Sequence, residues 1–540
     1  MPNLKKIPNL SYDSFMKFEE VTNFLYSLVE TRPDLCKLGS IGTSREGRKL
    51  HLLTVTDFKS GKPEDKPAYL IHGNIHSNEL AGTHASLYTA MRLVKEEPEL
   101  LKRITFYIIP RLNPDGAEFA VTTQGRVRSR IDKSIRLTNN LYQQDIDGNG
   151  MILSMRREHP DGALIKDPKD DRLMIRRKFN SKGPFYKVYP EGIIHNWDGS
   201  ENIKIGGRSF DWNRNWSYDW RPEPEQSGSG DFPFSELEMK CIAEFIHSRK
   251  NIFGILGYHT GPEAVLRPPS TGSDSDINEE DLIMMEELAQ IGSKETGFPV
   301  IPVIKYHKVN RRDNNLRGHF HNFGYHHLGL FVFEFELGVL TNSAGISTEE
   351  QFKAVKEEDI VEISRKLAKW IDTQKNKEEF FVNWKRFVHP QLGEVEIGGL
   401  RSTYVGNPSL SKLEEISKRT YSFTIKHSEM HPNVLIEEIK TESVGDGIYR
   451  IRAAVRNNGA LPTNITNKGK SLKRLQTVQV EFVLSEKSKL LSLTSFYDLG
   501  HLPGISGNKV EWFVSSKGKR LGSILLKAGT GGNQKYEITV

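Results

Sequence analysis

The chain contains very little cysteine. Only Cys36 and Cys241 occur among 540 residues, and two cysteines are too few for a framework of disulfides. This scarcity is typical of proteins from a reducing compartment. The first residues include lysines, but no apolar segment follows them, so they lack the pattern of a secretory signal. The sequence therefore predicts a cytoplasmic protein.

Long apolar runs and an excess of one charge are also missing. No uninterrupted apolar stretch approaches the about 20 residues that a membrane-spanning helix needs, so we expect no membrane association. The 75 Lys and Arg residues against 69 Asp and Glu residues leave a net charge of +6. So small an excess over this length gives no reason to expect nucleic acid as a partner. The length itself predicts two or more domains.

Short β-branched and aromatic runs alternate with amphipathic helical stretches between about residues 15 and 375. Four of these runs are too short for helices and are typical of buried strands; they span 68–71, 104–109, 252–258 and 329–337. Helical patterns lie between them, as at 79–95 and 236–247. This alternation predicts an α/β fold with a mixed, mostly parallel sheet and helices on both faces.

Three further segments differ from this pattern. Residues 129–209 are rich in Asp, Gly, Pro and Arg and have little periodicity, which predicts a long surface insertion in the domain at 1–375. Residues 376–431 are interpreted as a connecting region with one helix. Residues 432–540 alternate with a period of two between turn signals, and this pattern predicts a small all-β sandwich domain.

Several metal-binding side chains follow the predicted strands. His76 and Glu79 lie three residues apart where a strand gives way to a helix, so both can point to one side. Such a pair alone occurs easily by chance among 17 histidines. However, His259 ends a second strand and Glu336 lies in a third, and ligands in open α/β sheets gather beyond the carboxyl ends of strands. Glu334 shares a strand face with Glu336, and an acidic pair in an apolar strand requires a metal, a cation or solvent.

Other histidines compete for the same role. His72 precedes His76 by four residues, a spacing found in helical zinc pairs, but a glycine and an asparagine stand where that helix would be. His319 and His321 alternate and are able to chelate a metal from a strand. The other interpretation is that they line or flank the cleft.

Seven motifs, in order, resemble the zinc carboxypeptidases of the carboxypeptidase A type, peptidase family M14, over about residues 15–375. The motifs are Ser-Arg-Glu-Gly-Arg at 44–48, His-x-x-Glu at 76–79, Asn-Pro-Asp-Gly at 113–116, Asp-Trp-Asn-Arg-Asn-Trp at 211–216, Phe-Ser-Glu at 234–236, His259, and Phe-Glu-Leu at 335–337. Any one is modest evidence, but their common order makes chance implausible. The resemblance implies a zinc carboxypeptidase-like fold.

The resemblance also implies a metal centre. His76, Glu79 and His259 are expected to bind one zinc ion, with water as the fourth ligand. Glu336 is expected to act as the general base that deprotonates this water and later protonates the leaving amine.

The same resemblance implies which cations bind the substrate. Arg128 is expected to stabilise the oxyanion, with Arg126 and Arg130 as alternatives. Asn213 and Arg214 are expected to bind the C-terminal carboxylate of a peptide, since a guanidinium can do so with two hydrogen bonds. This pair favours exopeptidase over endopeptidase activity.

The substrate pocket departs from the family pattern. The tyrosine that covers the substrate terminus in the family has no clear counterpart: Asn314 occupies the ungapped position, and Tyr306 would serve only in a rearranged loop. The position that sets the side-chain preference falls near His321. A histidine there indicates neither an apolar nor an acidic pocket, so the preference stays open.

A possible calcium site lies in the insertion. Asp145, Asp147 and Asn149 alternate as in a calcium-binding loop. The twelfth position is Arg156, where an EF-hand requires Glu. Both a Ca²⁺ site and a polar turn are compatible with this pattern.

Three functions are compatible with these residues. The first is a metallocarboxypeptidase that acts on peptides with a free C-terminus. The second keeps the zinc site but acts as an amidase on cell-wall peptides or acyl-amino acids. The third is a catalytically silent peptide-binding module, although such a protein would need neither the three ligands nor Glu336. The oligomeric state is not predicted.

Overall fold

The computed structural model describes residues 6–132, 134, 137–308 and 316–540. Its central sheet has eight strands in the order β1-β2-β4-β3-β14-β17-β15-β16. Their bounds are β1 Cys36–Thr43, β2 Lys49–Val55, β3 Ala68–Gly73, β4 Thr105–Ile109, β14 Ile252–His259, β15 Ala264–Arg267, β16 Val300–Pro302 and β17 Phe331–Glu336. β4, β3, β14 and β17 run parallel, whereas β1 and β2 pair antiparallel with their neighbours. β15 pairs antiparallel with β17 and parallel with β16. The predicted mixed, mostly parallel sheet is confirmed.

Helices cover both faces of this sheet. Tyr69 of β3 hydrogen-bonds to His427 of α13 (Leu410–Glu429), 2.7 Å from Oη to Nδ1. His72 points from the opposite face of β3 and packs edge-to-face on Phe320, which begins α8 (Phe320–His326). Other helices of this domain are α1 Phe18–Thr31, α2 Ala81–Glu96, α3 Pro98–Arg103, α4 Pro114–Thr123, α5 Leu237–Ser248, α6 Glu279–Thr296, α7 Val303–Lys308, α9 Leu340–Ser343, α10 Thr348–Lys353, α11 Glu357–Thr373 and α12 Ser402–Val405.

The insertion at 129–209 forms strands, although its sequence lacks periodicity. The strands β7 (Ser154–Glu158), β10 (Tyr186–Pro190), β8 (Leu164–Asp167) and β9 (Asp170–Arg176) belong to a second sheet of six strands. The remaining two strands of that sheet are β18 (Phe381–His389) and β19 (Gly393–Leu400). The sheet has its own apolar core, which includes Met155 and Ile397. The local pattern does not reveal these strands because their faces are not clearly divided into buried and exposed; β9, for example, is half-buried over most of its length. Among the described residues of these strands, only those of β7 pair with a strand from outside the insertion, β19.

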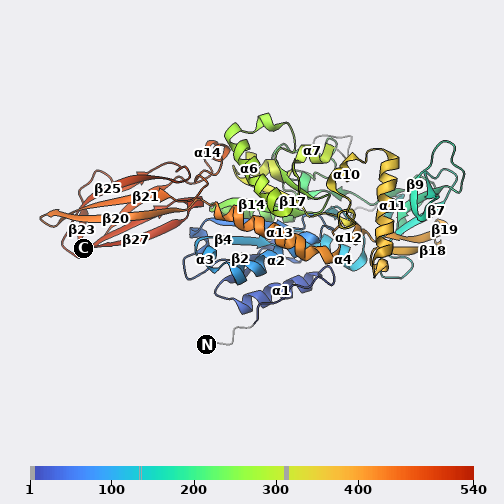
Figure 1. The fold of residues 1–540 in the computed structure, drawn as a ribbon, viewed down its shortest axis with the longest axis horizontal. Coiled ribbons are helices and arrows are strands. Elements are labelled where there is room, and N and C mark those ends of the chain that lie inside the picture. The colour runs from blue at the N-terminus through green and yellow to red at the C-terminus, as the bar shows by residue number, and fades with distance from the viewer. Residues whose placement is uncertain (1–5, 133, 135–136, 309–315) are drawn as a thin grey trace.

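Residues 376–431, predicted as a connecting region, therefore contribute to two parts of the structure. β18 and β19 complete the sheet of the insertion. α13 packs between α2 and α6, against the central sheet (Figure 1). The segment therefore contains strands and a helix that connect the sheet of the insertion to the central sheet, and it is not a simple loop.

The C-terminal region is the predicted β-sandwich. One sheet has the order β20-β21-β25-β23 and the other β24-β22-β26-β27, and all pairs are antiparallel. Trp512 lies fully buried among the apolar side chains between them. The strands are β20 Val434–Gly445, β21 Ile448–Asn457, β22 Gln479–Leu484, β23 Ser488–Leu490, β24 Phe496–Asp498, β25 Ser506–Ser516, β26 Arg520–Lys527 and β27 Asn533–Thr539.

The sandwich and the sheet of the insertion lie at opposite ends of the elongated molecule (Figure 1). Asp281 of α6 accepts backbone N–H groups from Asn467 and Lys468 of α14 (Asn467–Leu472). α14 lies between the sandwich strands β21 and β22 in the sequence, so this contact joins the sandwich region to the first domain. No helix within the described residues has both the length and the apolar character needed to cross a membrane.

Candidate active site

The strand ends bring three sequence-distant segments together. In the parallel register of β14 and β17, His259 lies beside Glu336. β3 ends at Gly73, three residues before His76, and pairs with β14 on its other side. A Cβ at Gly73 would lie 2.6 Å from the carbonyl oxygen of Gly82 in α2. Glycine at this position therefore lets the turn that carries His76 pass close to the helix.

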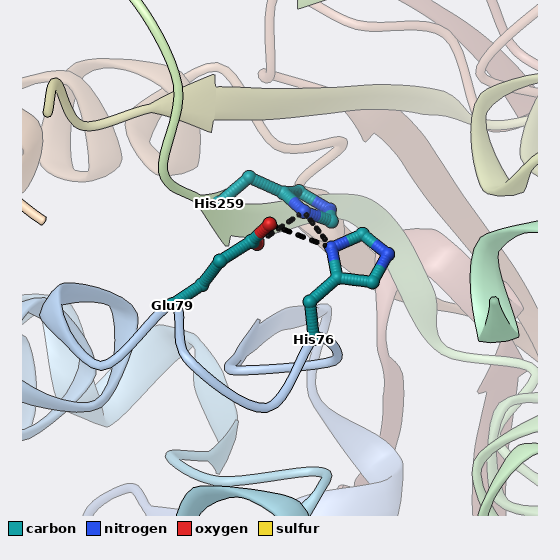
Figure 2. A group of neighbouring side chains, drawn as sticks. All are labelled: His76, Glu79 and His259. Atoms are coloured by element: carbon teal, nitrogen blue, oxygen red, sulfur yellow. Dashed lines mark hydrogen bonds and ion pairs between the residues drawn. The ribbon is translucent and has the colours of Figure 1, made fainter. Parts of the chain in front are cut away.

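His76, Glu79 and His259 converge on one point (Figure 2). Nδ1 of His76 lies 2.8 Å from Oε1 of Glu79, and Nδ1 of His259 lies 2.8 Å from Oε2 of the same carboxylate. The two Nδ1 atoms are 3.1 Å apart. All three side chains are at least 95% buried. Two imidazoles and a carboxylate are suitable ligands for zinc, and the convergence of their unshared electron pairs fits a bound cation.

The charges of the group reinforce this fit. Burial alone would raise the pKa of Glu79, but the neighbouring charges of His76 and His259 hold it well below its ordinary value. Burial opposes protonation of His259, yet Glu334 and Glu79 raise its pKa well above the ordinary value. Glu334 and Glu79 thus favour a positive charge at His259.

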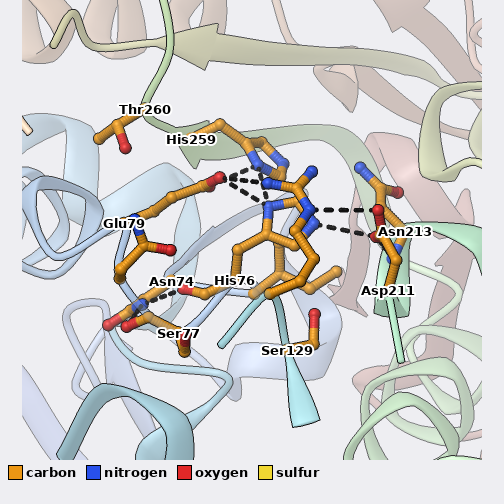
Figure 3. Close-up of polar contacts among 12 residues, drawn as sticks. Asn74, His76, Ser77, Glu79, Ser129, Asp211, Asn213, His259 and Thr260 are labelled. Carbon is orange, nitrogen blue, oxygen red and sulfur yellow. Dashed lines mark hydrogen bonds and ion pairs between the residues drawn. The ribbon is translucent and has the colours of Figure 1, made fainter. Parts of the chain in front are cut away.

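Asp211 lies beside the ligands (Figure 3), and Arg128 contacts both Asp211 and Glu79. Oδ1 of Asp211 lies 3.2 Å from Nε2 of His76, so the proton of this imidazole is directed away from the ligand point. Arg128 donates from Nε to Asp211 (3.1 Å) and from Nη1 to Oε1 of Glu79 (2.9 Å). Its side chain remains 38% exposed, so the guanidinium can also reach a molecule in the cleft.

Arg128 is favoured over the two alternatives by its position. Arg130 forms a bidentate pair with Glu236, at 2.6 and 2.8 Å. Arg126 is exposed, and its backbone N–H donates to Gln143. Among the three arginines, Arg128 is the one for which the described contacts include a candidate ligand.

Glu336 lies at the end of β17 and is 7% exposed. Burial, reinforced by the charge of Glu79, raises the pKa of Glu336 to about 8. A Cβ at Gly261 would lie 2.8 Å from Oε2 of Glu336 and still closer to the hydroxyl of Tyr306. Glu336 and the hydroxyl of Tyr306 thus both lie next to Gly261, where a larger side chain would collide with them.

The predicted substrate-binding residues lie in different environments. Tyr306 is buried and donates from Oη to the carbonyl of Pro262, at 2.9 Å. Asn314 lies outside the described residues. His321 is fully buried and lies 3.0 Å from Glu334, so the structure places it behind the metal ligands.

Arg214 is buried beside the ligand shell. Its Nη1 donates to the carbonyl of Asn213 (2.6 Å), and its Nη2 lies 3.4 Å from Oδ2 of Asp211. The side chain of Asn213 accepts the backbone N–H of Phe320 at 3.0 Å. Asp211 therefore connects the candidate carboxylate-binding pair to His76, a role that the sequence analysis did not assign although Asp211 begins the 211–216 motif.

The polar-turn interpretation is favoured for the proposed calcium loop. The two oxygens of Asp145 accept N–H groups from Gly148 and Gly150. Glu191 is buried and forms a cluster with Asp145 and Asp147, but its oxygens accept N–H groups from the same segment. Arg156 pairs with Glu396 in the second sheet. The calcium prediction has no support beyond the spacing of the acids.

About half of this chain is similar in sequence to known carboxypeptidases. Carboxypeptidase B from Astacus astacus is 25% identical over 285 residues, which cover 51% of this chain and 70% of that protein. Carboxypeptidase A6 from Homo sapiens is 24% identical over 281 residues, or 50% of this chain and 48% of that protein. The chain thus spans about half the length of the human relative.

Solved structures match the chain at lower identity. A carboxypeptidase A from Helicoverpa armigera matches with a TM-score of 0.41 and 17% identity over 68% of this chain and 77% of that one. A murein-tripeptide amidase from Escherichia coli O157 matches with a TM-score of 0.27 and 12% identity, over 62% of this chain and 97% of that one.

Two family profiles divide the chain. Residues 433–539 match a domain family of unknown function. Residues 21–361, more than half of the chain, match the zinc carboxypeptidase family. These residues include all the candidate ligands, and the chain belongs to the M14 zinc carboxypeptidase family of peptide-bond hydrolases.

Proposed function

We propose that the protein is a zinc-dependent carboxypeptidase that hydrolyses the last peptide bond of substrates with a free C-terminus. The observation that carries this proposal is the convergence of His76, Glu79 and His259 at one buried point, with Arg128 and Glu336 beside it. Membership of the zinc carboxypeptidase family supports the same chemistry.

The chain's own residues have distinct roles in this reaction. Zinc bound by His76, Glu79 and His259 would supply a Lewis acid and lower the pKa of a coordinated water to about 7. Glu336 accepts the proton of the attacking water and delivers it to the departing amine nitrogen. Arg128 stabilises the negative charge on the former carbonyl oxygen, because its guanidinium lies at the ligand group and is partly exposed.

Arg214 positions the substrate in this proposal. A guanidinium binds a carboxylate with two hydrogen bonds, and Arg214 lies within 3.4 Å of Asp211, next to the candidate ligands. A terminal carboxylate held there would place the last peptide bond near the metal. Such positioning explains why removal would be confined to the C-terminal residue.

Mass spectrometry of a mixed peptide library tests the proposal directly. We expect peptides with free carboxylates to shorten from the C-terminus one residue at a time, whereas C-terminally amidated copies persist. Cleavage within peptides, or equal loss of amidated copies, would contradict carboxypeptidase activity. Release of products only from cell-wall peptides or acyl-amino acids would indicate the amidase alternative.

Metal uptake is expected to depend on pH. Because the pKa of His259 is raised in the metal-free protein, His259 carries a proton at neutral pH that the metal must displace. Lower pH strengthens this competition, so zinc affinity should fall about tenfold per pH unit for each proton displaced. Calorimetric titration in two buffers of different ionisation enthalpy measures the proton release; uptake of zinc at pH 7 without any proton release would be inconsistent with this arrangement.

A further inference from the structure

A second group of metal-binding side chains lies directly behind the candidate ligands. His319, His321 and Glu334 place ligand atoms within 4.8 Å of one another, and they are 3%, 0% and 1% exposed. Their composition, two imidazoles and one carboxylate, equals that of the proposed zinc site. The group is therefore either a second metal site or a support for the first, and the hydrogen bonds of its histidines distinguish these possibilities.

His319 is excluded as a ligand by its neighbour Asn213. Oδ1 of Asn213 accepts the backbone N–H of Phe320 at 3.0 Å, so the amide nitrogen of Asn213 is the atom that faces Nε2 of His319, at 3.2 Å. An amide nitrogen only donates. Nε2 of His319 is thus the acceptor, and the ring proton lies on Nδ1, the atom that faces His321. His319 therefore has no unshared electron pair directed at the group.

His321 is oriented by the backbone. Its Nε2 lies 3.1 Å from the carbonyl oxygen of Leu266, and because a carbonyl only accepts, Nε2 carries a proton. Its Nδ1 lies 3.0 Å from Oε2 of Glu334. His321 therefore contacts the Glu334 carboxylate from one side, and it can donate to that carboxylate only with protons on both ring nitrogens.

His259 lies on the other side of the same carboxylate. Oε1 of Glu334 is 3.0 Å from Nε2 of His259, whereas Nδ1 of His259 belongs to the ligand group. A Cβ at Gly257, which pairs with Glu334 across the strands, would lie 2.9 Å from Cγ of Glu334. Glycine at 257 thus leaves the space that the carboxylate occupies.

A buried carboxylate is costly unless groups such as these compensate its charge. When it accepts from Nε2 of a histidine, it fixes the ring orientation and leaves Nδ1 available as a metal ligand. His76 is placed similarly, because its Nε2 forms a hydrogen bond of 3.2 Å with Asp211, whereas Nε2 of His259 forms an ion-pair contact of 3.0 Å with Glu334. Each of the two candidate histidine ligands thus has a carboxylate on its far nitrogen.

We propose that Glu334 is a positioning residue for the metal site: it holds His259 with the proton on Nε2 and with Nδ1 directed at the metal, while His321 packs against the carboxylate from behind. This inference rests on the proposed function, since it assumes that His259 is a ligand. It predicts one metal per chain rather than two.

The test is the zinc affinity of Glu334→Gln, measured by competition with a chromogenic chelator. The amide keeps the shape but loses the charge, so we expect affinity to fall about 10- to 100-fold. The visible absorption of the cobalt(II)-substituted variant should also differ from that of the wild type, because the orientation of His259 changes. The matched control is Glu238→Gln in α5, which replaces another buried carboxyl group, 1% exposed, that contacts no candidate ligand; it should change neither readout.

Each outcome has a defined meaning. Unchanged zinc affinity and an unchanged cobalt spectrum in Glu334→Gln overturn the inference. Two zinc ions per wild-type chain, with one lost in His319→Ala, also overturn it and establish a second metal site. If Glu334→Gln does not fold, His321→Asn replaces it: a smaller loss of affinity supports the inference, and no loss overturns it. A wild-type chain that binds no zinc contradicts the proposed function itself, and this inference with it.

Discussion

Glu336→Gln is expected to lower turnover about 100- to 10,000-fold, the usual contribution of a general base, while zinc content stays at one ion per chain. The carboxylate lies at the end of β17 beside His259, and the charges and burial around it raise its pKa to about 8. A glutamine of the same shape can neither accept the proton of the attacking water nor return it to the amine. The loss should therefore appear in kcat.

Zinc analysis and steady-state kinetics on the same preparation measure this prediction. The control is again Glu238→Gln, which removes a buried carboxyl group from α5 and should keep full activity. Two results would show that Glu336 is misassigned. One is turnover that survives in Glu336→Gln; the other is loss of zinc together with activity, which would make Glu336 a ligand instead.

Arg214→Ala is expected to lower kcat/KM for peptides with a free C-terminus about 100- to 1,000-fold. The estimate corresponds to the loss of a buried, charge-assisted pair of hydrogen bonds. The fall in kcat/KM should arise from weaker binding of the substrate's C-terminal carboxylate. Any residual cleavage of C-terminally amidated copies should therefore change far less.

Comparison of the two substrates separates recognition from structural damage. Arg214 also contacts Asp211, and removal of this contact could disturb His76, which would lower activity on both substrates equally. Arg214→Lys serves as the matched variant, because it keeps the charge but loses the bidentate geometry; it should recover part of the activity on free-carboxylate peptides. Equal losses on both substrates in both variants would contradict the assignment of Arg214.

The sequence alone was sufficient for the central sheet and its family. The runs that form β3, β14 and β17 are mostly apolar and are buried along their whole length, and such runs are typical of parallel strands buried on both faces. The strand-to-helix turn at His76 and Glu79 is equally local, since it depends on residues within a single short motif. The alternation at 432–540 also predicted the sandwich, because each strand shows its buried face in its own sequence.

The insertion shows where local pattern fails. β7 pairs with β19, more than 200 residues away, as Glu396 does with Arg156. A pairing between segments that distant leaves no signal in a short window of sequence. A segment interpreted as a surface excursion and another interpreted as a connecting region thus prove to be parts of one sheet.

For the candidate active site too, some residues could be selected from the sequence and others only from the structure. Strand-end positions and the ordered motifs of the family resemblance selected His76, Glu79, His259 and Glu336 from the sequence, whereas residue types and spacing alone did not. Only the tertiary structure distinguished Arg128 from its two neighbours, since that choice depends on which guanidinium reaches Glu79 and Asp211.

Only the tertiary structure gave Glu334 a partner. The sequence showed an acid in an apolar strand, and physical chemistry required a compensating group, but many histidines were available. The parallel register of β14 and β17 decided the matter, because it brings Nε2 of His259 within 3.0 Å of that carboxylate. Sequence determines which chemical groups are present and which local elements carry them, whereas contacts between distant strands determine which groups meet.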